Sequence, residues 1–291
     1  MSTPDSSTPK WNLIIDLDRC NNCNNCVLAV KDEHVGNDFP GYAAPQPLHG
    51  RPWLELKRAE HGQAPIVDIV HLPAMCNHCD DAPCVKAGRG AVKKRDDGIV
   101  IIDPQAARGR RDLVDACPYG AVRWNEELQL PQHWIFDAHL LDQGWKAPRC
   151  AQACPTEAIR AVKVSDAEMA RLSAEQGLEV LNPELGTRPR VHYRNLKRFT
   201  HWVLAGSVVT LRDGVEECIE GAEVTLSHDG QVVARAVTDA FGEYRLRDLE
   251  STEATYQLDI SHPESETTLQ TIELMMSTTL SPFTLRKNNS F

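Results

Sequence analysis

The sequence predicts two domains of different class: an α+β domain over residues 1–200, organised around loops that carry cysteines, and an all-β sandwich over residues 201–291. Two observations lead to this prediction. Nine of the ten cysteines lie within the first 154 residues, where loops rich in Pro, Gly, Asn and Asp separate short apolar runs. From about residue 203 onward, apolar and polar residues alternate in short segments.

Two short strands are expected in the first domain. The stretch "WNLIIDLDRC" at 11–20 predicts a strand that runs directly into the first cysteine loop. The stretch "GIVIIDP" at 98–104 predicts a second strand, which ends at Pro104 because proline cannot donate to a strand ladder.

One helix and a linker complete the first domain. Ser165 and Glu168 have the spacing of a capping box, so we expect a helix over about 166–176 that ends near Gly177. The segment from about 182 to 199 is polar, holds two prolines and several basic residues, and we interpret it as the linker between the domains.

The second domain shows the alternation of half-buried strands in "AEVTLSH", "QVVARAV", "GEYRLRDL" and "TYQLDIS". Turn residues in "HDG", "DAFG" and "HPES" separate these segments, which is typical of an antiparallel β-sandwich. The preceding "HWVLAGSVVTL" is too short to cross a bilayer, so we interpret it as a buried strand.

Charge and hydropathy restrict the class of protein. The net charge of −10 argues against a nucleic-acid binder, which would be basic. No run of roughly 18–20 apolar residues predicts a membrane span. The polar stretch "MSTPDSSTPK" has no apolar region typical of a signal peptide, so we expect a cytoplasmic protein.

The first cysteine loop has iron–sulfur spacing. Cys20, Cys23 and Cys26 follow the x2–x2 pattern of bacterial ferredoxins, which normally continues with three more residues and a fourth cysteine; here that fourth place holds Val30. In two-cluster ferredoxins the fourth cysteine of each run serves the other cluster, so Val30 does not damage the site of its own loop. Its fourth ligand is expected from a distant segment.

Three more segments carry cysteines, and in a reducing compartment such clustering indicates metal rather than disulfides. They are Cys76-x2-Cys79-x4-Cys84, the Cys117-Pro118 pair, and Cys150-x3-Cys154-Pro155.

The stretch from "DACPYGAVRW" to "RCAQACPTEAI" resembles the iron–sulfur subunits of the dimethyl sulfoxide reductase family of molybdopterin oxidoreductases. In that family the first cysteine segment pairs with the fourth and the second with the third. The resemblance therefore implies a tandem bacterial-ferredoxin fold with two [4Fe–4S] clusters. Their ligands would be Cys20, Cys23, Cys26 and Cys154 for the first cluster, and Cys76, Cys79, Cys84 and Cys117 for the second.

Two further cluster positions of the family are degenerate. A fourth cluster is expected to be absent, since its places hold no thiol: Gly88, Ala107, Arg110 and Leu113. A third cluster is not expected either, since Cys150 is the one thiol left among Val30, Trp134, Asp137 and Cys150. Whether Asp137 is a weak oxygen ligand stays open, and we hypothesise that Trp134 fills the volume of the lost cluster.

Zinc is the alternative, because cysteines in x2 pairs also build zinc ribbons. Zinc ribbons prefer two pairs of ligands, whereas each implied set here has three close cysteines and one remote cysteine followed by proline. The visible absorption of iron–sulfur clusters separates the two possibilities.

The stretch "EGAEVTLSHDGQVVARAVTDAFGEYRLRDL" resembles a transthyretin-like or carboxypeptidase-regulatory-like sandwich of Ig-like architecture. An iron–sulfur subunit that ends in such a domain is similar to the small subunits of the pyrogallol–phloroglucinol transhydroxylase and resorcinol hydroxylase type. The stretches "DEHVGNDFPGY" and "GAVKKRDDGIVIIDP" extend the resemblance.

This resemblance implies an electron-transfer or structural subunit without catalytic residues of its own. Its partner would be a large subunit with molybdenum or tungsten bis-pterin guanine dinucleotide, in a heterodimer or higher oligomer acting on polyhydroxylated aromatics in anaerobic degradation. The alternatives are the electron-transfer subunit of another molybdopterin reductase or oxidase, and a scaffold whose clusters only stabilise the fold.

Overall fold

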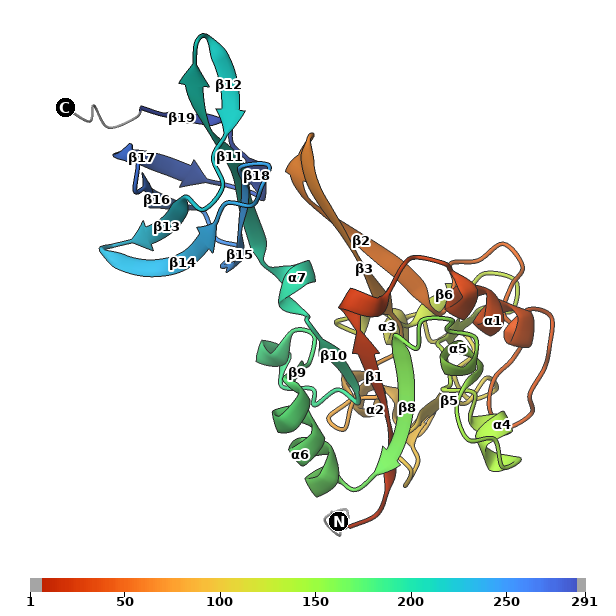
Figure 1. Cartoon of the computed structure of the whole chain (residues 1–291). Helices are drawn as coiled ribbons and strands as arrows, with labels where there is room; N and C mark the ends of the chain where they lie inside the picture. Colours follow the sequence, from red (N-terminus) through yellow and green to blue (C-terminus); the bar gives the residue numbers. More distant parts are fainter. Residues whose placement is uncertain (1–6, 287–291) are drawn as a thin grey trace. The chain divides into compact units, whose positions relative to one another are not determined.

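The computed structural model describes residues 7–286, which divide into two compact units (Figure 1). The first unit comprises residues up to 57 together with 71–196, and the second comprises 58–70 together with the chain from 197 onward. In the described part of the chain, no helix is both long and apolar enough to cross a membrane.

The first unit is organised by a four-stranded sheet in the order β8-β1-β10-β9. Its strands are β1 (Lys10–Asp16), β8 (Ile159–Val164), β9 (Leu178–Glu179) and β10 (Val191–Arg194). The predicted strand at 11–20 is confirmed as β1, which pairs antiparallel with β8 and parallel with β10. Leu13 and Ile15 on one face and Ile14 on the other are all buried, as expected for a strand covered on both faces.

Small elements surround this sheet and carry the cysteine loops. The helices are η1 (Leu17–Arg19), α1 (Asn25–His34), α2 (Pro83–Gly88), α3 (Asp112–Asp115), α4 (Ala138–Asp142), α5 (Arg149–Gln152) and η2 (Pro183–Leu185). Two short hairpins are formed by β4 (Val92–Lys94) with β5 (Val100–Ile102), and by β6 (Arg123–Asn125) with β7 (Leu130–Gln132). The predicted strand at 98–104 is confirmed as β5.

Helix α6 (Asp166–Gln176) has the predicted limits. The Ser165 hydroxyl accepts a hydrogen bond from the Glu168 backbone N–H over 3.2 Å, which satisfies one of the unpaired N–H groups of the first turn. The helix ends at Gly177, whose φ of 61° lies in the left-handed region that glycine adopts without a Cβ clash.

The segment expected to be a linker from about 182 is instead part of the first unit. Its residues 191–194 form β10, and the Arg190 guanidinium pairs with Asp80 at 2.6 Å and Asp166 at 2.8 Å. Arg190 is only 3% exposed, so this basic residue is an internal cross-link rather than part of a solvated connection. The linker prediction was wrong because Arg190 pairs with carboxylates inside the first unit and the residues that follow it join the sheet.

A long hairpin, β2 (Glu55–Gln63) and β3 (Ile66–Ala74), starts in the first unit, and its tip belongs to the second. At the tip, the His61 ring nitrogen Nδ1 lies 2.7 Å from the Ser277 hydroxyl, and the Gln63 N–H donates to Thr279 Oγ1 over 2.9 Å. These bonds explain why residues 58–70 group with the second unit.

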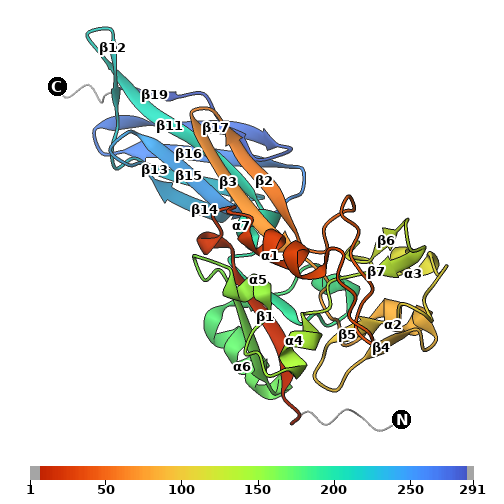
Figure 2. The same cartoon turned by 90° about the vertical axis from the view of Figure 1, so that its right-hand side faces the viewer.

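The second unit is the predicted antiparallel sandwich, and its strands are labelled in Figures 1 and 2. One sheet contains β11 (Trp202–Arg212), β12 (Val215–Cys218), β15 (Glu243–Leu249), β18 (Thr278–Thr279) and β19 (Phe283–Leu285). The other contains β13 (Glu223–His228), β14 (Gln231–Val237), β16 (Ala254–His262) and β17 (Ser265–Leu274), and α7 (Lys197–Thr200) precedes both sheets. Inward-facing residues of both sheets, such as Leu204, Leu226, Leu246 and Leu258, form one fully buried core.

Candidate metal centres

The first cysteine group gathers around one cavity. Cys20, Cys23, Cys26 and Cys154 line one small pocket within the first unit. Cys20 follows η1, Cys26 lies in the first turn of α1, and Cys154 follows α5. The structure thus brings the remote cysteine to the three-cysteine loop, as the predicted pairing requires.

The loop reaches this shape through two asparagines with positive φ. Asn22 has φ of 60° and Asn24 has φ of 61°, a conformation that asparagine adopts more readily than most side chains. The turns let three cysteines within seven residues face a common space. Cys26 is buried, whereas Cys23 is exposed, so one side of this group is open to solvent.

The thiols of the first group differ in acidity. Burial above all, together with the nearby Cys20, Cys154 and Cys23, raises the pKa of Cys26 to about 12. Burial opposes ionisation of Cys154 as well, but hydrogen bonds from the Ile159 backbone and the Thr156 hydroxyl outweigh burial and lower its pKa. The backbone near Cys154 therefore provides donors for a sulfur that carries negative charge.

The second cysteine group is more deeply enclosed. Cys76, Cys79 and Cys84 are buried and Cys117 is half-buried. Burial raises the pKa of Cys76 well above its ordinary value, and the neighbouring Cys84, Cys117 and Cys79 add to the effect. Burial likewise raises the pKa of Cys84 to about 11. The four thiols are thus mutual neighbours, as the predicted pairing requires.

Both groups have the donor chemistry of a cubane cluster. Each supplies four thiols, three from one loop and one from a remote segment, which is the ligand number of a [4Fe–4S] cluster. Crowding of buried thiols favours their neutral form, because neighbouring thiolates would repel one another. Iron binding relieves this repulsion, since the metal takes the place of the protons. The residues present therefore fit such clusters at both positions.

The degenerate third position is packed with side chains. Trp134, Asp137 and Cys150 are fully buried and Val30 is 1% exposed. The Asp137 carboxylate accepts hydrogen bonds from Trp134 Nε1 over 3.2 Å and from the Arg149 backbone N–H over 2.7 Å. Protein donors therefore occupy both of its oxygens, and the Trp134 indole is fully buried. That it fills the volume of a lost cluster stays a hypothesis.

The degenerate fourth position is apolar core. Ala107 and Leu113 are fully buried in one hydrophobic cluster. A Cβ on Gly88 would lie 2.6 Å from a methyl group of Val92, so no larger side chain fits there without a shift. Arg110 turns its guanidinium to the Ala87 carbonyl, to which it donates over 2.8 Å. Apolar packing thus occupies the place for which the resemblance implies a lost ligand set.

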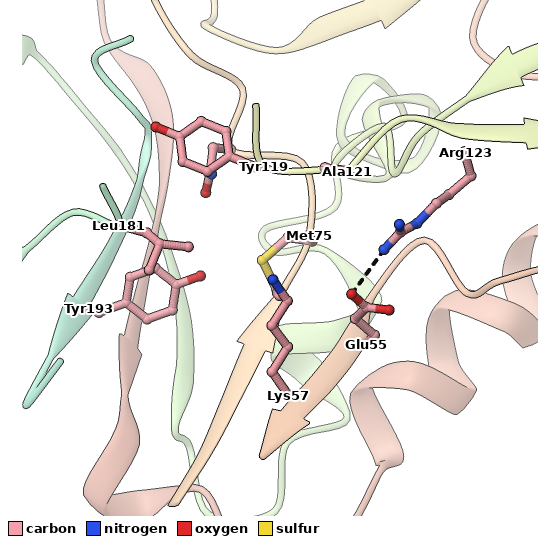
Figure 3. A pocket seen from close by; sticks show the side chains of 10 residues that line it. Glu55, Lys57, Met75, Tyr119, Ala121, Arg123, Leu181 and Tyr193 are labelled. Atoms are coloured by element: carbon pink, nitrogen blue, oxygen red, sulfur yellow. Dashed lines mark ion pairs between the residues drawn. The ribbon is translucent and has the colours of Figure 1, made fainter. Parts of the chain in front are cut away.

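A separate small pocket lies within the first unit (Figure 3). Met75, the chain neighbour of Cys76, lines it together with Tyr119, which follows Cys117 by two residues. At the opposite wall, the Arg123 guanidinium pairs with Glu55 over 2.9 Å. No cysteine is among the described residues that line this pocket, so it offers no further thiol.

One residue near the second group was not anticipated from the sequence. The Lys94 ammonium donates to the carbonyls of His78 over 2.7 Å and of Cys79 over 2.9 Å, within the second cysteine loop. The available signal was strand alternation, since Lys94 shares a face of β4 with the buried Val92 whereas Lys93 points to solvent.

Comparison with known proteins agrees with this architecture. Residues 67–164 match a model described as 4Fe-4S dicluster domain, and residues 203–286 match one described as carboxypeptidase regulatory-like domain. The chain is also 44% identical to the pyrogallol hydroxytransferase small subunit of Pelobacter acidigallici, over 86% of this chain and 90% of that protein. The chain belongs to the family of the pyrogallol hydroxytransferase small subunit.

Other members of the wider group are less similar. One subunit of the sulfite dehydrogenase of Allochromatium vinosum is 33% identical over 62% of this chain and 81% of that protein. One subunit of the tetrathionate reductase of Salmonella typhimurium is 31% identical over 64% of this chain and 73% of that protein. The two matching domain models confirm the predicted fold class, a ferredoxin-like domain followed by a β-sandwich.

Proposed function

We propose that this chain is the iron–sulfur subunit of a heterodimeric molybdenum or tungsten bis-pterin enzyme that hydroxylates or transhydroxylates polyhydroxylated aromatics. The observation that carries the proposal is the 44% identity to the pyrogallol hydroxytransferase small subunit over nearly its whole length. The eight cysteines gathered in two groups of four support it, as does the match of residues 67–164 to a 4Fe-4S dicluster domain.

We assign one [4Fe–4S] cluster to each cysteine group. The first is held by Cys20, Cys23, Cys26 and Cys154, and the second by Cys76, Cys79, Cys84 and Cys117. When bound, such clusters accept and donate single electrons. The chain's own residues position the thiols, exclude water from the second group and supply hydrogen bonds to sulfur, as the Ala121 N–H does to Cys117 over 3.4 Å.

The substrate chemistry is assigned to a large partner subunit, which would hold the bis-pterin guanine dinucleotide. The first cluster is the one we expect nearest that centre, and the exposure of Cys23 supports this orientation. A cytoplasmic location stays a prediction.

The filled third position favours a reaction with little net electron export. In the wider family that position lies between the two clusters retained here, so its loss widens the gap that an electron must cross. The fully buried Trp134 and Asp137 now occupy it. This supports a transhydroxylase over an enzyme that passes every electron through this subunit to an external acceptor.

Two alternatives remain. The similarity to subunits of a sulfite dehydrogenase and of a tetrathionate reductase favours an electron-transfer role in another molybdopterin enzyme. A scaffold, in which the clusters only stabilise the fold, is the other.

Anaerobic copurification with the product of the adjoining large-subunit gene tests the proposal. We expect iron and acid-labile sulfide near eight each per small subunit, a visible cluster absorption, and turnover of pyrogallol without an added electron acceptor. Zinc in place of iron would contradict the cluster assignment. Turnover that needs an added acceptor would favour the reductase or oxidase alternative. Clusters whose spectrum never changes with dithionite or turnover would favour the scaffold.

A further inference from the structure

Lys94 places a positive charge inside the second cysteine loop. Its side chain is 20% exposed, and its ammonium donates to the carbonyls of His78, Cys79 and Gly98 over 2.7, 2.9 and 2.9 Å. The ammonium also lies 2.9 Å from a carboxylate oxygen of Asp80. The three N–H donors of an ammonium serve these acceptors better than the two of a neutral amine, so the geometry favours the charged form.

The charge of Lys94 is not cancelled by Asp80. Both carboxylate oxygens of Asp80 also bind the Arg190 guanidinium, over 2.7 and 2.6 Å. Arg190 in turn pairs with Asp166, which Lys10 also contacts over 2.7 Å. Three cations and two carboxylates therefore form one network with a net positive charge, in a chain whose total charge is −10.

The backbone at Gly98 leaves room for this network. Gly98 has φ of +88°, and a Cβ there would lie 2.9 Å from Arg190 and 3.1 Å from Lys10. The absence of a side chain lets Arg190 pass against the turn whose carbonyl binds Lys94. The network is thus a built feature of the fold and not a chance approach of surface side chains.

We propose that Lys94 is the positioning residue of the second cluster and the residue that raises its reduction potential. Its hydrogen bonds hold the Cys76–Cys79 turn in the shape that presents the thiols. Its charge stabilises the reduced cluster, which carries one more negative charge than the oxidised cluster. The inference rests on the assignment of Cys76, Cys79, Cys84 and Cys117 as ligands.

The electron balance is simple. One electron from the reductant enters the second cluster, no bond forms or breaks, and Lys94 keeps its proton in both states. Removal of the fixed positive charge therefore disfavours the reduced state without changing the ligands.

Redox titration with dithionite and mediators, followed by electron paramagnetic resonance on the anaerobically purified complex, tests this. Lys94→Gln keeps N–H donors but removes the charge. We expect the ratio of reduced to oxidised second cluster at a fixed potential to fall about tenfold, a shift of about 59 mV for one electron. Lys94→Arg restores the charge and should return the ratio to within about threefold of wild type.

Lys93→Gln is the matched control, because it removes the same charge from the exposed neighbour on β4. It should leave both clusters unchanged, and the first cluster should be unchanged in every variant. Asp80→Asn removes a carboxylate from the network, so we expect the ratio for the second cluster to rise.

The outcomes separate this inference from the proposed function. Wild-type protein without two [4Fe–4S] clusters would refute the cluster assignment itself. Two clusters in wild type, with no change of ratio in Lys94→Gln and in Asp80→Asn, would overturn the role of Lys94 alone. If Lys94→Gln loses four irons while Lys93→Gln keeps them, the positioning role is supported, and the sign of the Asp80→Asn shift decides the electrostatic role.

Discussion

The indole Nε1 of Trp134 donates a hydrogen bond to Oδ1 of Asp137 over 3.2 Å, and both side chains are fully buried. The same oxygen lies 2.9 Å from Nε2 of His34, which is buried as well. Where the resemblance implies a lost cluster, the described residues thus form a hydrogen-bonded core. Burial of a carboxylate is tolerated there because three donors from the protein satisfy it.

Trp134→Ala is expected to destabilise the first unit by about 3–5 kcal/mol, because it opens a large cavity and removes a donor from Asp137. The iron count should stay near eight, since Trp134 is no cluster ligand. Thermal melting with iron analysis measures both effects. Trp145→Ala is the control: this tryptophan is 40% exposed, so its loss should cost roughly 0.5 kcal/mol or less. Equal effects of the two substitutions would contradict the packing role of Trp134.

Cys154→Ala is expected to lower the iron count from about eight to about four per chain, because the first group loses its remote thiol. Cys150→Ala removes a thiol four residues away, on α5, and should leave the iron count unchanged. The buried Cys150 lies at the filled position, where its role is packing. Iron analysis with electron paramagnetic resonance compares the two variants. Loss of iron from Cys150→Ala with retention in Cys154→Ala would reverse the assignment.

Acid is expected to destabilise the first unit through His133. Burial lowers the pKa of His133 to about 4, although its hydrogen bond to the Trp134 carbonyl opposes this. An unfolded histidine, with a pKa of about 6.5, takes up a proton that the folded one refuses, so stability is lost as pH falls below about 6.5. Between pH 7 and pH 5, protonation of this histidine in the unfolded state should lower the free energy of unfolding by about 2 kcal/mol.

His133→Asn tests the pH effect, since it removes the titrating ring. Thermal melting at pH 7 and pH 5 should show a smaller decrease in Tm for this variant than for wild type. His49→Asn removes an exposed histidine and should keep the wild-type decrease. The same decrease in all three proteins would exclude His133 as the cause.

Ser165→Ala is expected to destabilise helix α6 by about 1 kcal/mol, because the Glu168 N–H loses its acceptor. Ser173→Ala, within the same helix, should be neutral or slightly stabilising because alanine is the better helix former. Thermal melting of both variants measures the difference. Destabilisation by Ser173→Ala of the same size would show that the hydroxyl cap contributes nothing specific.

Much of the fold could be predicted because its signals are local. The Ser165 cap, the glycine that ends α6 and the alternation of the sandwich strands each depend on a few consecutive residues. The gathering of the cysteines was predictable for another reason: their spacing indicates a metal site, and the resemblance to iron–sulfur subunits implied which segments pair. For Trp134, the sequence led only to the hypothesis that the side chain fills a volume. It did not predict the hydrogen bond to Asp137.

What sequence reasoning missed is non-local. Strand β10 holds two apolar residues, Val191 and Tyr193, among basic ones, and its partner β1 lies almost 180 residues earlier. No local pattern distinguishes such a strand from a polar linker. The buried Arg190 and the half-buried Lys94 were missed for the same reason, since a charged side chain is tolerated inside only when distant partners, here Asp80 and Asp166, are already in place.

The placement of Cys154 also sets an order for biosynthesis. Cys117 leaves the ribosome 33 residues after Cys84, whereas Cys154 follows Cys26 by 128 residues. At about 5–20 residues per second, the nascent chain carries three thiols of the first group for roughly 6–26 s before the fourth exists. The second cysteine group is complete within a nascent chain that still lacks β8 and β10. The loop that is translated first is therefore the last to receive its full set of thiols.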